Sequence, residues 1–99
     1  MITRIVKMTF REEKVNDFRE FTGTIKDRIR NFSGCEHLAF FQDIHKKNIF
    51  FTYSHWRSEK DLDNYRNSDF FRETWTQART WFADKPEAWS LSPPLRPGT

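Results

Sequence analysis

The sequence predicts a single α+β domain whose elements follow the order β-α-β-β-α-β. Three observations lead to this prediction. Several segments alternate between apolar and polar side chains, as half-buried strands do. Two longer segments carry apolar side chains at intervals of three and four, as amphipathic helices do. Ser and Gly residues stand where one pattern gives way to the next, which favours helix caps and turns at those points.

The first strand is expected over residues 2–10. Its alternate positions carry a mostly apolar set, Ile2, Arg4, Val6, Met8 and Phe10, and its composition favours β-structure.

A first helix is expected over residues 13–31 and to end at Ser33-Gly34. One face of it carries the apolar side chains Val15, Phe18, Phe21, Ile25, Ile29 and Phe32. Gly23 interrupts this helix at a cost of about 1 kcal/mol relative to Ala. We interpret Gly23 as the mark of a close packing contact.

Two strands are expected next, over residues 35–44 and 48–56, joined by a polar hairpin loop at residues 45–47. Both are rich in Phe, and the second adds Thr and Tyr, which favour strands. The pairs Phe40-Phe41 and Phe50-Phe51 place rings on both faces of the sheet. Alternation alone does not decide which ring of each pair points inward.

The second helical region is expected to be broken in two. Ser58 is the expected N-cap of its first part, and Asp61 stands where a capping box carries its acidic residue. Ser68 caps the second part, which carries Phe71, Trp75, Ala78 and Phe82 on one face and ends at residues 84–86. A short last strand over 87–92 completes the domain, 1–92, and a Pro-rich tail, 93–99, follows.

This order is the ferredoxin-like split βαβ pattern, with an antiparallel sheet and its helices on one face. The other face carries too many rings to remain in water. We therefore expect two such faces to pack together as a homodimer, a dimeric α+β barrel.

Composition argues against several classes of protein without excluding them. The 99 residues have a net charge of +3, with 31% charged side chains of both signs, so no nucleic-acid partner is expected. The N-terminus does not resemble a signal peptide, and no segment has the length of a membrane span. One cysteine, Cys35, allows no internal disulfide, and a reducing cytoplasm is expected.

The chain resembles the antibiotic biosynthesis monooxygenase family from about residue 2 to residue 91. The resemblance lies in Gly34 before the second strand, in the strand end Tyr53-Ser54-His55-Trp56, in the helix start Arg57-Ser58-Glu59, and in the step Ser68-Asp69-Phe70-Phe71. It implies a homodimer with a pocket between sheet and helices. It also implies oxidation of quinols or aromatic molecules by O₂, often without metal or flavin, so we expect no cofactor.

The resemblance also shows where this sequence departs from active relatives. The haem-degrading branch has an Asn on the first strand, which is lacking here, and Trp and His where this chain has Tyr65 and Trp75. Many quinol-oxidising relatives carry His at the position of Tyr65, and often another near Phe70. Haem degradation is therefore not expected.

Three residues are candidates for catalysis. Tyr65 would orient or deprotonate a phenol-like substrate, or it is a helix residue packed on the sheet. Trp56 would stack on a flat substrate and donate its N–H, or it is a ring of the core or dimer interface. His55 would serve as a general base, or it is a hydrogen-bonded strand residue.

Phe41, Phe51, Phe71 and His37 are candidates for substrate binding, as pocket walls. If paired residues of the hairpin sum to about 92, His37 lies opposite His55 and Cys35 shares their face, so a Cys/His/His metal site is conceivable. The simpler interpretation, which we adopt, is no metal site, hydrogen-bonded histidines and a small buried Cys35.

Three functions remain open. The first is a cofactor-independent monooxygenase acting on a small aromatic or quinol-type substrate. The second is a non-catalytic dimeric protein that binds a small ligand in the same pocket. The third, by fold analogy, is an RNA-recognition domain, which shares this order of elements. Such domains carry a Gly after the first basic residue of their strand-three motif and a stacking aromatic residue in the middle of their first strand, and this chain lacks both.

Overall fold

The protein is described here from a computed structural model, which describes residues 1–95. Its elements are β1 (Ile2–Thr9), a 3₁₀ turn η1 (Glu12–Lys14), α1 (Val15–Arg30), β2 (Cys35–Gln42), β3 (Ile49–Trp56), α2 (Glu59–Arg66), α3 (Asp69–Arg79) and β4 (Glu87–Leu91). The predicted order of elements is confirmed. Within residues 1–95, no helix is long and apolar enough to cross a membrane.

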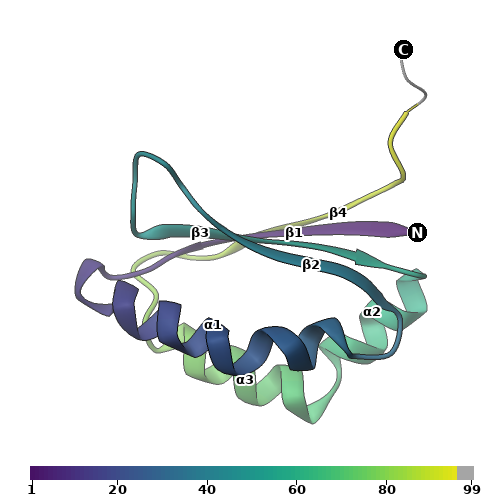
Figure 1. The fold of residues 1–99 in the computed structure, drawn as a ribbon, viewed down its shortest axis with the longest axis horizontal. Helices are drawn as coiled ribbons and strands as arrows, with labels where there is room; N and C mark the ends of the chain where they lie inside the picture. Colours follow the sequence, from purple (N-terminus) through teal and green to yellow (C-terminus); the bar gives the residue numbers. More distant parts are fainter. Residues whose placement is uncertain (96–99) are drawn as a thin grey trace.

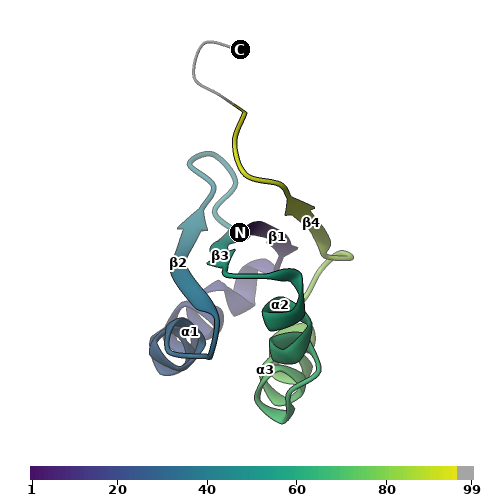
Figure 2. The same ribbon diagram turned by 90° about the vertical axis from the view of Figure 1, so that its right-hand side faces the viewer.

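The four strands form one antiparallel sheet in the order β2-β3-β1-β4. All helices cover one face of this sheet, and no helix or strand of residues 1–95 covers the other face (Figures 1 and 2). We call these the helix face and the open face. The fold class is therefore the expected α+β ferredoxin-like one.

Alternation decides which side chains the helix face receives. Met8 of β1 pairs with Phe50 of β3, and both are buried under α1 beside Phe10 and Phe18. The rings of Phe10 and Phe18 stack with centroids 4.1 Å apart. A second core cluster consists of Ile25, Ile29, Cys35, Trp56 and Leu62. A few large rings thus supply much of the burial that a small domain needs.

Two predicted helix caps are confirmed. The Ser58 hydroxyl accepts a hydrogen bond from the backbone N–H of Asp61, and the Ser68 hydroxyl accepts one from that of Phe71. The Asp61 carboxylate in turn accepts hydrogen bonds from the Ser58 hydroxyl and from Arg57. Each cap satisfies a backbone donor that a helix start leaves unpaired.

Gly34 turns the chain from α1 into β2. It adopts φ +90°, which side-chain-bearing residues rarely adopt. A Cβ added at Gly34 would lie 2.4 Å from the Cβ of Asp61, so the turn also packs directly against the start of α2. The predicted helix end at Ser33-Gly34 is thus explained by both backbone conformation and packing.

Some predicted details are wrong. An added Cβ at Gly23 would meet nothing within 4 Å, so this glycine marks no close contact. The last helix ends at Arg79 rather than at residues 84–86, because the chain leaves it through a turn that joins Phe82 to Phe10 by a β-bridge. Of the predicted tail, residues 96–99 lie outside the described residues.

One irregularity alters the face assignment of β2. His37 pairs with His55 as predicted, but Cys35 pairs with Trp56, so Glu36 is an extra residue that bulges out of the pairing. Cys35 therefore lies in the core beneath α1, while His37 and His55 lie on the open face. The conceivable Cys/His/His metal site is thus wrong. Burial raises the pKa of the Cys35 thiol, as suits the small buried residue that was expected.

Candidate functional site

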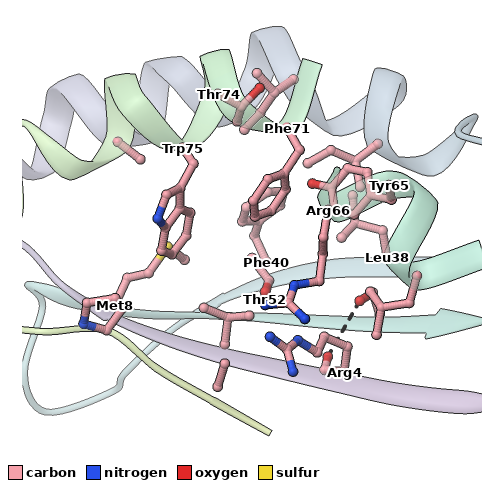
Figure 3. Close-up of a pocket in the computed structure, with 18 of the residues that line it drawn as sticks. Arg4, Met8, Leu38, Phe40, Thr52, Tyr65, Arg66, Phe71, Thr74 and Trp75 are labelled. Carbon is pink, nitrogen blue, oxygen red and sulfur yellow. Dashed lines mark hydrogen bonds between the residues drawn. The ribbon is translucent and has the colours of Figure 1, made fainter. Parts of the chain in front are cut away.

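A cavity of about 290 Å³ lies between the helix face of the sheet and the helices that cover it. Its walls are mostly apolar and aromatic. Figure 3 shows Tyr65, Phe71 and Trp75 reaching from the helices toward Met8, Phe40 and Thr52 on the sheet. Cavities of this kind, with many apolar and few polar groups, are typical of small-molecule sites.

Tyr65 of α2 lines this cavity and is packed among other rings. It stacks on Trp56 with centroids 4.8 Å apart and meets Phe71 edge-on at 5.1 Å. Burial raises the pKa of the Tyr65 phenol well above its usual range. The phenol is therefore protonated at neutral pH and can donate a hydrogen bond to a ligand, but it cannot act as a base.

The Tyr65 hydroxyl makes no side-chain hydrogen bond to any of residues 1–95, yet it is not among atoms that are completely buried without a partner. It thus retains some access to the cavity.

Trp56 also borders the cavity, but its indole N–H donates to the Ser54 hydroxyl at 3.0 Å. The side chain is only 1% exposed. The predicted donation of this N–H to a substrate is therefore not available, and Trp56 serves mainly as a core ring that supports Tyr65.

The remaining predicted site residues divide between the two faces. Phe71 lines the cavity and stacks on Trp75. Four others, His37, Phe41, Phe51 and His55, alternate to the open face. There the His55 imidazole is hydrogen-bonded to the Tyr53 hydroxyl at 2.9 Å. The structure therefore does not bring these four together with Tyr65, and His55 is not placed to act as a base on a molecule in this cavity.

Two charged residues that the sequence analysis did not propose stand at the cavity. Arg4 reaches it from β1 and Arg66 from the last turn of α2 (Figure 3). Burial, and next the nearby charge of Arg66, lower the pKa of the Arg4 guanidinium. A signal existed in the sequence, because Arg4 is the one charged member of the apolar set of the first strand.

The cavity contains no strong base within the part of the chain that is described. Its lining includes no Asp, Glu, His, Lys or Cys. Among residues 1–95, no cluster of three or more His, Cys, Asp or Glu could hold a metal ion. The polar side-chain groups of the lining are hydroxyls, the indole N–H groups of Trp56 and Trp75, and the two guanidinium groups; of the two indoles, that of Trp56 is already bonded to Ser54.

A ferredoxin-like sheet with helices on one face and an aromatic-lined cavity between them defines a class of small α+β proteins. Within it, the sequence profile of the antibiotic biosynthesis monooxygenase family matches residues 1–77, and the chain belongs to this family. A search of curated proteins finds no significant match to this chain.

Solved structures agree on the fold. A conserved protein from Methanosarcina mazei Go1 is 22% identical, with a TM-score of 0.85 over 92% of this chain and 91% of that one. A structure described as an antibiotic biosynthesis monooxygenase is 13% identical, with a TM-score of 0.89 over 96% of this chain and 100% of that one. Rv0793 from Mycobacterium tuberculosis is 15% identical, with a TM-score of 0.86 over 98% of each chain.

Proposed function

We propose that this chain is a monooxygenase that oxidises a small aromatic or quinol-type molecule with O₂ in the cavity, without a bound cofactor. The observation that carries this proposal is the aromatic-lined cavity with the Tyr65 hydroxyl at its wall. Membership of the family supports the reaction class.

The chemistry is that of an electron-rich ring. A deprotonated quinol or anthrone passes one electron to O₂, and the resulting radical pair combines to a peroxide anion, which takes up a proton from solvent to give a hydroperoxide. Loss of water then leaves the oxidised ring, so that one oxygen atom enters the product and the other leaves as water. The protein has to bind the ring, exclude bulk water and stabilise the anion.

The residues at the cavity can bind the ring and stabilise its anion. Phe71 and Trp75 offer flat surfaces against which a ring can pack. The protonated Tyr65 phenol can donate a hydrogen bond to an anionic ring oxygen, and hydrogen bonds to charged groups are stronger than those between neutral ones. Since the lining offers no base, the substrate proton has to pass to solvent.

Replacing Tyr65 with Phe tests this role. We expect kcat/KM for quinol oxidation to fall by at least about tenfold, because a hydrogen bond to an anion contributes about 1.5–3 kcal/mol. We expect little change in stability, because the hydroxyl bonds to no other side chain among residues 1–95. The measurements are O₂ uptake with a panel of reduced quinols and anthrones, and urea unfolding.

Tyr53→Phe is the matched control, because it removes the same hydroxyl outside the cavity. Since Tyr53 lies on the open face and its hydroxyl is hydrogen-bonded to His55, the stability and the molecular mass of this variant are measured beside its rate. Equal rates for Tyr65→Phe and the unmodified protein would contradict the role given to Tyr65.

A non-catalytic ligand-binding function is the second candidate. The observation that favours it is the lack of an acid, a base or a His in the described cavity lining. If the folded protein binds quinols but consumes no O₂ above background with any of them, this second function is the correct one.

We further propose that the protein acts as a homodimer whose protomers meet through their open faces. Apolar side chains there have no cover within the described chain: Phe41, Trp89 and Leu91 are 54%, 45% and 43% exposed. Burial of such a patch is the usual reason for association. We also propose the reducing cytoplasm as the compartment of this protein, since the chain has a single cysteine, Cys35, and so needs no oxidising environment for an internal disulfide.

Trp89→Glu is expected to weaken this dimer by a factor on the order of 30, because losing an aromatic anchor of an interface costs about 2 kcal/mol or more. Light scattering during size-exclusion chromatography over a dilution series measures the shift to monomer. Gln77→Glu adds the same charge on the exposed surface of α3 and should leave the mass unchanged. A monomeric unmodified protein would refute the proposed dimer.

A further inference from the structure

We propose that the ligand of this cavity is an aromatic carboxylate, whose ring lies among the cavity rings and whose carboxylate is held between Arg4 and Arg66. This inference names the substrate class for the cavity on which the proposed function rests. It stands on the position of the two guanidinium groups, on the absence of an acidic partner for either of them among residues 1–95, and on the size of the cavity.

The two arginines approach one cavity from opposite walls. Arg4 belongs to the helix face of β1, where it pairs with Ser54 of β3, and Arg66 descends from the end of α2. Both line the cavity, and Figure 3 shows their guanidinium groups at the same end of it. Two planar forks facing one space match the geometry of a carboxylate, which accepts paired N–H donors.

Neither charge is balanced by an acidic side chain within residues 1–95. The ion pairs in that part of the chain join Lys14 to Asp17, Arg57 to Asp61 and Arg72 to Asp69. The neighbouring strand β4 does not supply a carboxylate here, because Glu87 pairs with Lys7 on the open face. The lowered pKa of Arg4, due to burial and then to Arg66, agrees with an uncompensated positive pair.

Structural roles account for only part of this arrangement. The Arg4 guanidinium donates to the Ser90 hydroxyl at 2.8 Å, and Arg66 in the last turn of α2 interacts favourably with the helix dipole. Each guanidinium has five N–H donors, so most of them remain available. Neither role explains why both charges face one apolar cavity, whereas an anionic ligand lowers the energy of both.

The volume of the cavity limits the size of the aromatic ring system that a ligand can have. Its volume of about 290 Å³ lies near the lower end of ligand pockets, which span roughly 300–1,000 Å³. A ligand of one or two fused rings suits this space. With its carboxylate at the arginines, such a ring extends toward Phe71 and Trp75, along the wall that also holds Tyr65.

The test compares 2-naphthoate with its neutral isostere 2-naphthamide by isothermal titration calorimetry, without O₂ chemistry. We expect the unmodified protein to bind the carboxylate at least about tenfold more tightly than the amide, because charge-assisted hydrogen bonds contribute roughly twice as much as neutral ones. Arg66→Gln should remove most of this preference, and Arg66→Lys should retain part of it. Arg4→Gln should also reduce the preference, and it needs a parallel unfolding measurement because it loses the bond to Ser90.

Arg19→Gln is the matched control, since it removes one positive charge from the exposed surface of α1. It should keep the preference for 2-naphthoate. Equal affinity for the two probes, no detectable binding of 2-naphthoate, or a preference that persists in folded Arg66→Gln and Arg4→Gln proteins would each overturn the proposal.

The outcome is separable from that of the monooxygenase proposal. Selective carboxylate binding without O₂ uptake, tested with hydroxynaphthoate quinols, would leave the arginine site intact and refute the oxidation. Oxidation of neutral quinols by a protein that shows no preference for 2-naphthoate over 2-naphthamide would do the reverse.

Discussion

Trp56→Ala is expected to lower the free energy of unfolding by about 3–5 kcal/mol, the usual cost of removing a buried Trp or Phe. The Trp56 ring is 1% exposed and stacks on Tyr65. Its edge also meets the ring of Phe32, with centroids 6.4 Å apart. The substitution leaves a cavity among these rings and removes the N–H partner of the Ser54 hydroxyl. Urea unfolding followed by circular dichroism measures the change.

Trp56→Phe is the control for this prediction, because it keeps a ring in the core while it loses the indole N–H and part of the ring volume. We expect it to cost clearly less than Trp56→Ala. A loss below about 1 kcal/mol for Trp56→Ala, the range of ordinary surface substitutions, would show that the ring is not a core element. Because a domain has only about 5–15 kcal/mol of stability, lost activity in Trp56→Ala would report unfolding as much as chemistry. Tyr65→Phe is therefore the better probe of the site.

Gly34→Ala is expected to destabilise the protein by about 2–5 kcal/mol, from a left-handed backbone cost of about 1–2 kcal/mol and overpacking of about 1–3 kcal/mol. The φ of +90° disfavours any Cβ at this position. The added methyl group would also collide with Asp61, whose carboxylate is held by Arg57 and by the N-cap Ser58. Thermal and urea unfolding measure the effect.

Gly23→Ala gives the opposite result in the same assay. Gly23 lies within α1, where an added Cβ meets nothing within 4 Å. It should therefore stabilise the protein by about 0.5–1 kcal/mol, since Ala loses less backbone entropy in a helix. If both substitutions changed stability in the same direction, the distinction between a turn glycine and a helix glycine drawn here would be wrong.

Local patterns were sufficient to predict the fold. Alternation identified the strands, apolar spacing identified the helices, and Ser58 and Ser68 were recognised as caps because their chemistry is local. The pairing of His37 with His55 depended on the assumption that paired residues of the hairpin sum to about 92, and the structure has this pair. These features depend on neighbours in the sequence, so the sequence displays them directly.

The candidate site was less predictable because it depends on packing between distant elements. In the pairs Phe40-Phe41 and Phe50-Phe51 both residues are Phe, so no contrast in polarity indicates the inward face. The structure turns Phe40 and Phe50 to the helices and the other two outward. Arg4 was the one charged residue in the apolar set of the first strand, but its position at the cavity can be interpreted only together with Arg66. Arg66 is 62 positions away in the chain, and the two arginines come together only because α2 packs against the sheet.

The bulge at Glu36 has a consequence for how relatives of this protein are aligned. The extra residue allows the segment between α1 and β2 to vary in length by one without exchanging the two faces of the strand. An alignment gap belongs at Glu36 when a relative lacks the bulge. A gap placed further along β2 would shift the intervening residues by one position, assigning His37 to the core and Leu38 to the outer surface, and would equate side chains that point in opposite directions.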